Sequence, residues 1–249
     1  MPQTLHNPGV EQPFRLNPEL DLSGLAETYH ATSRVRIHDL LAEDGLADFY
    51  DNLDTRDDWW HLMNTADGIV ELDRAMRARM GVKRRNALDA QVQEGARTGF
   101  QYRYEGLRVP DRDEAAGPAD PLTAFADLMS SEPMLAMLRT VTGCAELAFT
   151  DGQATAYGVG DFLTCHDDNV HGKNRLAAYV FGMTPSWRAE WGGLLLFHEA
   201  NGSRLTGHVP QFNSLDLFVV PQCHSVSLVT PAAPRRRYAV TGWLRAGER

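Results

Sequence analysis

The sequence predicts an α+β protein in which helices come first and the strands of a sheet follow. Residues 22–97 contain several segments with apolar residues at helical spacing. From residue 147 onward, short apolar runs rich in β-branched and aromatic residues alternate with loops marked by glycine and proline. A chain of 249 residues, 43% of them hydrophobic, is long enough to bury one sizeable core.

The first part of the chain is predicted to be mainly helical. Prolines at positions 2, 8, 13 and 18 favour an irregular arm over residues 1–20. Helices are expected at residues 22–30, 40–53, 67–80 and 88–97, and short strands at residues 33–38 and 100–104.

The second part begins with a polar connection and becomes strand-rich. Residues 107–120, LRVPDRDEAAGPAD, form either a mobile flap over a pocket or a solvated connection. Two helices are expected within residues 121–141, the second starting at Pro133. Helices first and strands second indicate that the helices support one face of a sheet.

Two metal-binding residue types lie two positions apart in the segment TCHDDN. On an extended strand such residues point to the same side, so His166 and Asp168 can reach one ion while Asp167 points away. Two imidazoles and one carboxylate leave the other metal positions open, as in non-haem Fe(II) oxygenases. With 9 histidines and 33 acidic residues, the pair can also arise by chance in a solvated loop.

A third candidate ligand, His224, lies far downstream in PQCHSV. The preceding segment SLDLFVV is apolar and β-rich, and Pro221 ends it. His224 is therefore expected across a sheet from the first pair. The segment from Tyr157 to Thr164, YGVGDFLT, is expected to be a strand with a glycine bend that enters the first motif, and Gly192-Gly193 opens another strand.

A run of three arginines opens the last predicted strand, RRRYAVTGW. Strand alternation places Arg237 and Trp243 on the same face, with Ala239 and Thr241 between them. Because Arg237 opens an apolar strand, we expect its side-chain stem to be buried and its guanidinium to be paired. Arg235 and Arg236 are expected in a solvated turn. If the strand register differs by two residues, Arg235 takes the place of Arg237.

The order of these motifs resembles the Fe(II)/2-oxoglutarate-dependent dioxygenases, specifically their prolyl-hydroxylase-like branch. The resemblance covers residues 100–245. It implies a double-stranded β-helix, or jelly roll, in a single catalytic domain. Residues 1–98 would be the mainly helical N-terminal support, and residues 99–249 the jelly-roll core with the iron site.

The resemblance also implies roles for individual residues. His166, Asp168 and His224 match the iron ligands. Arg237 and Tyr157 match residues that hold the distal carboxylate of 2-oxoglutarate, although the interval from His224 to Arg237 is slightly longer than in several relatives. The implied cofactors are Fe(II), 2-oxoglutarate as cosubstrate and O2, with ascorbate as a stimulant.

The substrate implied by the resemblance is a prolyl residue in a protein or peptide, with release of succinate and carbon dioxide. Arg175 matches an arginine that holds the substrate backbone, and Trp243 matches a tryptophan that lines the pocket. One alternative is hydroxylation of a free amino acid or another small molecule. Another is a jelly roll that binds a ligand without turnover.

The remaining histidines and the cysteines have simpler expected roles. His171 and His198 are candidates for substrate contact, whereas His6, His30, His38, His61 and His208 are assigned to structure or solvent. Three cysteines do not indicate a disulfide framework. Cys165 and Cys223 directly precede candidate ligands, and packing is favoured over redox sensing for both.

Charge and hydropathy exclude several partners. A net charge of −9 disfavours non-specific nucleic-acid binding, which requires clustered cations. No apolar run reaches the length of a membrane span, and the first residues lack the apolar core of a secretory signal. The expected location is the cytoplasm.

Overall fold

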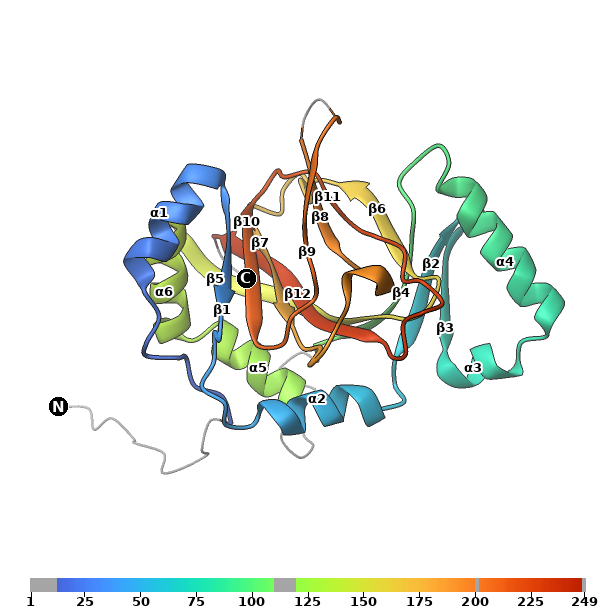
Figure 1. Ribbon diagram of the computed structural model, residues 1–249, viewed down its shortest axis with the longest axis horizontal. Helices are drawn as coiled ribbons and strands as arrows, with labels where there is room; N and C mark the ends of the chain where they lie inside the picture. The colour runs from blue at the N-terminus through green and yellow to red at the C-terminus, as the bar shows by residue number, and fades with distance from the viewer. Residues whose placement is uncertain (1–12, 110–119, 200–201, 248–249) are drawn as a thin grey trace.

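The computed structural model describes residues 13–109, 120–199 and 202–247, whose strands form one curled antiparallel sheet (Figure 1). The strands are β1 (Arg34–His38), β2 (Trp60–Thr65), β3 (Gly68–Asp73), β4 (Tyr102–Arg108), β5 (Leu147–Tyr157), β6 (Phe162–His166), β7 (Arg175–Gly182), β8 (Leu195–His198), β9 (Leu205–His208), β10 (Ser214–Val219), β11 (His224–Val226) and β12 (Arg237–Ala246).

The strand order makes the sheet a jelly roll. The order is β1-β10-β7-β12-β5-β4-β6-β11-β8-β9, and the β2–β3 hairpin joins through pairing of β2 with β4. One wall of the barrel contains β1, β10, β7, β12 and β5, and the other contains β6, β11, β8 and β9. Strand β4 pairs with β5 over one half of its length and with β6 over the other, so it joins the two walls. The predicted α+β class with a double-stranded β-helix is confirmed.

Helices α1, α2, α5 and α6 cover the outer face of the wall that contains β5, β7, β10 and β12 (Figure 1). The helices are α1 (Leu22–Thr32), α2 (Leu46–Thr55), α3 (Arg74–Arg79), α4 (Val82–Gly95), α5 (Pro121–Met129), α6 (Glu132–Thr142) and the 3-10 helix η1 (Ala189–Trp191). Helices α1, α2, α5 and α6 contribute to the main core, whereas α3 and α4 lie beside the β2–β3 hairpin. Within the described residues, no helix is both long and apolar enough to cross a membrane.

Strand β7 shows how the main core and the barrel interior share one wall. Its alternate residues Ala177 and Phe181 belong to the core under the helices, whereas Ala178 and Val180 belong to a second apolar cluster inside the barrel. All four are buried, because this strand is covered on both faces. A continuous apolar sequence is therefore required here instead of polar alternation.

Two expected helices of the first part differ from prediction, and the arm, irregular as expected over residues 13–20, contributes a core residue. Residues 67–73 belong to the β2–β3 hairpin, and only residues 74–79 of the expected helix 67–80 are helical. Helix α2 begins at Leu46, whereas Leu40 and Leu41 are buried core residues outside it. Phe14, within the expected irregular arm, is buried in the core. Most of the 107–120 connection lies outside the described residues.

A disulfide joins Cys165 of β6 to Cys223, which directly precedes β11. The expectation that these cysteines are simply packed is therefore wrong. Cys165 and Cys223 are diagonal neighbours on the antiparallel pair in which His166 lies opposite His224, and their Cα atoms are 6.0 Å apart. Cys144 is free.

Candidate metal centre

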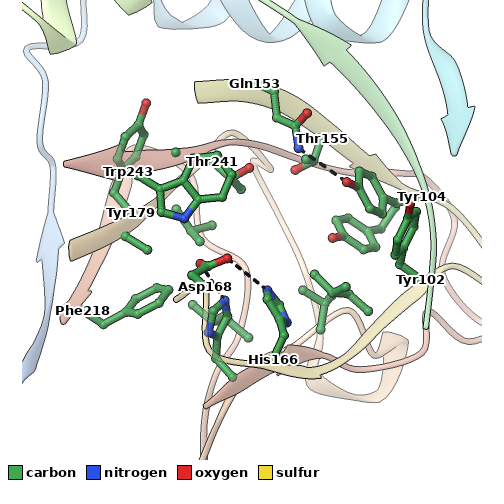
Figure 2. A pocket seen from close by; sticks show the side chains of 18 of the residues that line it. Tyr102, Tyr104, Gln153, Thr155, His166, Asp168, Tyr179, Phe218, Thr241 and Trp243 are labelled. Carbon is green, nitrogen blue, oxygen red and sulfur yellow. Dashed lines mark hydrogen bonds and ion pairs between the residues drawn. The ribbon is translucent and has the colours of Figure 1, made fainter. Parts of the chain in front are cut away.

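Three candidate ligands meet inside the barrel: His166 at the end of β6, Asp168 just after it, and His224 at the start of β11 (Figure 2). One candidate ligand atom from each residue lies within 4.8 Å of the others. Asp168 Oδ1 lies 3.6 Å from His166 Nε2, and Asp168 Oδ2 lies 3.5 Å from His224 Nε2. Two imidazole nitrogens and one carboxylate suit Fe(II) and leave the remaining positions open for other ligands.

The chain reaches this arrangement through a turn after β6. The prediction that one extended strand carries both His166 and Asp168 is wrong in this detail, because β6 ends at His166. Asp168 has a φ of 61°, in the left-handed region that aspartate tolerates better than most residues. The turn brings its carboxylate back towards the two imidazoles.

Hydrogen bonds fix the orientation of both imidazole rings. His166 Nδ1 donates to the Thr164 carbonyl oxygen at 3.1 Å, and His224 Nδ1 donates to the Gln222 carbonyl oxygen at 2.8 Å. Because a carbonyl only accepts, each neutral ring keeps its lone pair on Nε2, the atom nearest Asp168. Burial, and secondarily the nearby His166, lowers the pKa of His224, which keeps this imidazole neutral as a metal ligand requires.

Arg175 lies against the candidate ligands rather than in the pocket. Its Nη1 donates to the Asp168 carbonyl oxygen at 2.9 Å and lies 3.8 Å from Asp168 Oδ1. Its guanidinium carbon is 3.6 Å from the centroid of the Trp243 ring, which does line the pocket. Arg175 is therefore placed to hold the turn at Asp168, whereas the sequence suggested contact with a substrate backbone.

Arg237 and Tyr157 face each other across β12 and β5, as directly paired residues. The Arg237 guanidinium carbon lies 5.3 Å from the Tyr157 ring centroid, and both side chains line the pocket that holds the three candidate ligands. Arg237 is only 4% exposed. Among the described residues no carboxylate forms an ion pair with it, so the pocket contains a buried cation suited to an anionic ligand.

The neighbouring arginines have other positions. Arg236 Nε lies 2.9 Å from the buried carboxylate of Glu105, on the other side of the strand from the pocket, and Arg235 is exposed. The alternation expected for β12 is observed: Arg237, Thr241 and Trp243 line the pocket.

The two other histidines near the motifs do not line the pocket. His171 is exposed. His198 Nε2 lies 2.8 Å from Ser225 Oγ, beside a separate hollow. The geometry therefore provides no support for a substrate contact by either residue.

The pocket has a volume of about 250 Å³ and an aromatic wall that the sequence reasoning missed. Figure 2 shows Tyr102 and Tyr104 on one side and Trp243 and Tyr179 on the opposite side. Tyr104 stacks on Tyr157, with ring centroids 5.3 Å apart. The signal was the alternation in FQYRY, which places Phe100, Tyr102 and Tyr104 on one strand face.

The sequence is similar to one protein-family model and to a curated prolyl hydroxylase. Residues 152–245 match the family model described as the 2OG-Fe(II) oxygenase superfamily. Prolyl 3-hydroxylase OGFOD1 of Mus musculus is 26% identical over 152 residues, covering 58% of this chain and 27% of that protein. The chain thus spans about a quarter of the length of this curated relative.

Solved structures show the same fold. A prolyl 4-hydroxylase of Pseudomonas putida superposes with a TM-score of 0.55 at 17% identity, covering 91% of this chain and 100% of that chain. A Trichoplax adhaerens prolyl hydroxylase, in complex with a hypoxia inducible factor peptide fragment, gives a TM-score of 0.58 at 14% identity. The second match covers 90% of this chain and 89% of that chain.

Proposed function

We propose that the chain is a prolyl-hydroxylase-like 2OG-Fe(II) oxygenase that hydroxylates a prolyl residue of a polypeptide, as its similarity to this family and to prolyl hydroxylases supports. The reaction consumes 2-oxoglutarate and O2 and releases succinate and carbon dioxide. The observation that carries the proposal is Arg237, a buried cation in the same pocket as two histidines and an aspartate.

Five polar residues of the pocket have proposed roles in binding the metal and the cosubstrate. His166, Asp168 and His224 would hold Fe(II), and Arg237 with Tyr157 would hold the distal carboxylate of 2-oxoglutarate. When bound, iron and 2-oxoglutarate would supply the chemistry that inserts one oxygen atom into a C–H bond of the substrate. Burial raises the pKa of the Tyr157 hydroxyl, so it remains protonated and can donate a hydrogen bond to a carboxylate.

The protein contributes position and exclusion of water. Arg175 holds the turn that aims Asp168, and Trp243 lies over the guanidinium of Arg175. Apolar side chains of Ala178, Val180 and Phe218 form part of the pocket wall. A dry pocket strengthens the attraction between Arg237 and an anionic ligand.

The polypeptide substrate and the location are further parts of the proposal. Prolyl hydroxylation is supported by the activities in the names of the relatives, including one solved with a peptide fragment bound. We assign the enzyme to the cytoplasm, with no nucleic-acid partner because its net charge is −9. A single catalytic domain is also proposed, since strands before and after residue 98 pair in one sheet.

The test measures iron binding and turnover of 2-oxoglutarate in four variants. His166→Ala, Asp168→Ala and His224→Ala should each lose bound iron and succinate formation in the presence of Fe(II), 2-oxoglutarate and ascorbate. Asp167→Ala is the matched control, because Asp167 is exposed and its carboxylate accepts a hydrogen bond from the Asn169 amide. Full iron content and turnover in any of the first three would remove that residue from the ligand set.

A further inference from the structure

A second, larger groove continues from the pocket across the strands β4, β2 and β3. It has a volume of about 800 Å³, against about 250 Å³ for the pocket. The groove and the pocket share three lining residues, Tyr102, Tyr104 and Gln153. The two spaces therefore meet at these two aromatic rings and this amide. Figure 2 shows these three side chains together on one side of the pocket.

The groove floor is formed by one face of this part of the sheet. Trp60 and Leu62 alternate on β2, and Ile69 and Glu71 alternate on β3. Gly106 of β4 pairs with Trp60 of β2. An added Cβ at Gly106 would be 2.9 Å from Leu62 Cδ1, so the absence of a side chain keeps the floor open.

Two large apolar side chains on this floor face solvent. Trp60 is 42% exposed and Ile69 is 63% exposed. Neither belongs to the apolar clusters of the core. They lie on the same face of the hairpin but four residues apart along it, because Trp60 pairs with Asp73 and Ile69 pairs with Asn64. Exposed large apolar side chains beside a pocket are typical of a surface that a partner covers.

The groove lining contains two carboxylates, Asp58 and Glu71, and one guanidinium, that of Arg108. Residues 57–73 contain five acidic side chains and neither lysine nor arginine. The carboxylate of Asp58 is already paired with Arg56 at 2.7 Å. Glu71 is exposed, and among the described residues no ion pair involves it. It lies near Tyr102, whose pKa is raised by burial and further by the Glu71 charge.

We propose that this groove binds the polypeptide that flanks the target residue, with apolar side chains over Trp60 and Ile69 and a lysine or arginine beside Glu71. This inference rests on the proposed function, because the target residue must enter the pocket at Tyr102 and Tyr104. Glu71 is level with Tyr104 through the pairs Glu71–Leu62 and Leu62–Tyr104, whereas Arg108 lies four residues further along β4. Charge complementarity therefore selects a basic residue at the Glu71 end of the groove.

The strand spacing predicts where the basic residue lies in the substrate. A bound polypeptide that runs from β4 to β3 crosses two inter-strand intervals, about 10 Å in all. An extended polypeptide covers that distance in roughly three residues. The basic residue should therefore lie about three to five residues from the target, once the step from the pocket is included.

The experiment compares long and short peptides. The long probes are a degenerate library of peptides of about fifteen residues with a fixed central proline. The short probe is a capped Ala-Pro-Ala tripeptide, which can occupy only the pocket. Mass spectrometry detects the gain of one oxygen, and succinate is measured in parallel. The library should yield oxidised members enriched in lysine or arginine about three to five residues from proline.

Variants of the groove should weaken binding of the selected long peptide without changing the chemistry. Trp60→Ala and Ile69→Ser should each raise KM about tenfold, with kcat and tripeptide turnover nearly unchanged. Glu71→Lys should reverse the flank preference to acidic residues. The controls are Leu205→Ser, at an apolar position 53% exposed on β9, and Glu146→Lys, an exposed position after α6. Both should leave KM unchanged.

The outcomes separate the groove from the proposed function. Equal turnover of long and short peptides, or no effect of the three groove variants, would overturn the groove alone. Succinate formation with oxidation of free proline but no peptide would overturn the polypeptide substrate and the groove together. No succinate and no oxidised product from iron-loaded protein would overturn the proposed function itself.

Discussion

At the scale of single residues, the burial of Arg237 distinguishes it from its two neighbours. It lies in the pocket without a carboxylate partner among the described residues, whereas Arg236 pairs with buried Glu105 and Arg235 faces solvent. The three adjacent arginines therefore have different environments, and their substitution should have different consequences.

Arg237→Ala should weaken 2-oxoglutarate binding far more than Arg235→Ala. Loss of one partner from a buried charge pair costs about 2–5 kcal/mol, or roughly thirty-fold to several thousand-fold in affinity. An exposed arginine should cost under about 1 kcal/mol. Isothermal titration of the metal-loaded protein measures the difference. A large effect at Arg235 with none at Arg237 would show that Arg235 takes the place of Arg237.

Arg175 gives a second prediction at this scale. Because its guanidinium binds the Asp168 carbonyl, Arg175→Ala should weaken metal binding by roughly 10- to 100-fold. Competition with a metal chelator measures the affinity, and Lys173→Ala is the exposed control. Unchanged metal affinity with lost peptide oxidation would instead support the substrate contact that the sequence suggested.

At the scale of elements, the turn that enters β8 depends on glycine. Gly192 has a φ of 70°, and an added Cβ would lie 1.9 Å from the Leu228 carbonyl oxygen. Strand β8 pairs with β11, which carries His224, so the entry to β8 supports the position of that histidine.

Gly192→Ala should lower the free energy of unfolding by more than about 3 kcal/mol, because it combines a disfavoured φ with a backbone clash. Gly172→Ala is the matched control: φ is 78°, but no atom lies within 4 Å of the added Cβ. It should cost only about 1–2 kcal/mol. Urea unfolding measures both, and equal losses would show that the contact with Leu228 relaxes.

The elements also show what the sequence could predict. Alternation correctly placed Arg237, Thr241 and Trp243 on one face of β12, because that face is specified locally. The β2–β3 hairpin was missed although Asp67-Gly68 is a strong turn signal, because the downstream residues are good helix formers. The bond between Cys165 and Cys223 depends on pairing of strands 58 residues apart, which spacing alone does not reveal.

The candidate site was only partly predictable for the same reason. His166, Asp168 and His224 come together as expected, although their role as ligands remains a prediction. Asp168 reaches the site through a left-handed turn that no residue pattern announces. Tyr104 and Phe218 come from distant strands and enter the pocket only once the barrel closes.

At the scale of the whole molecule, binding of Fe(II) and 2-oxoglutarate should stabilise the fold, because the residues that would hold them come from strands of both walls. Binding of a ligand at 100 times its Kd adds about 2.7 kcal/mol to the free energy of unfolding. Fe(II) under anaerobic conditions should raise Tm, and 2-oxoglutarate should raise it further only when metal is present. Asp168→Ala should abolish both shifts. A shift with 2-oxoglutarate alone would indicate that Arg237 binds it without metal.

The bond between Cys165 and Cys223 also determines how the chain behaves when it is cut. It closes a loop that contains β7, β8, β9 and β10, so a protease nick at the exposed Gly202 would leave both fragments covalently joined. On a denaturing gel, nicked oxidised protein should run as one species without reductant and as two fragments with it. Thiol-reducing compartments such as the cytoplasm would yield two fragments in either case, provided free thiols are blocked at lysis.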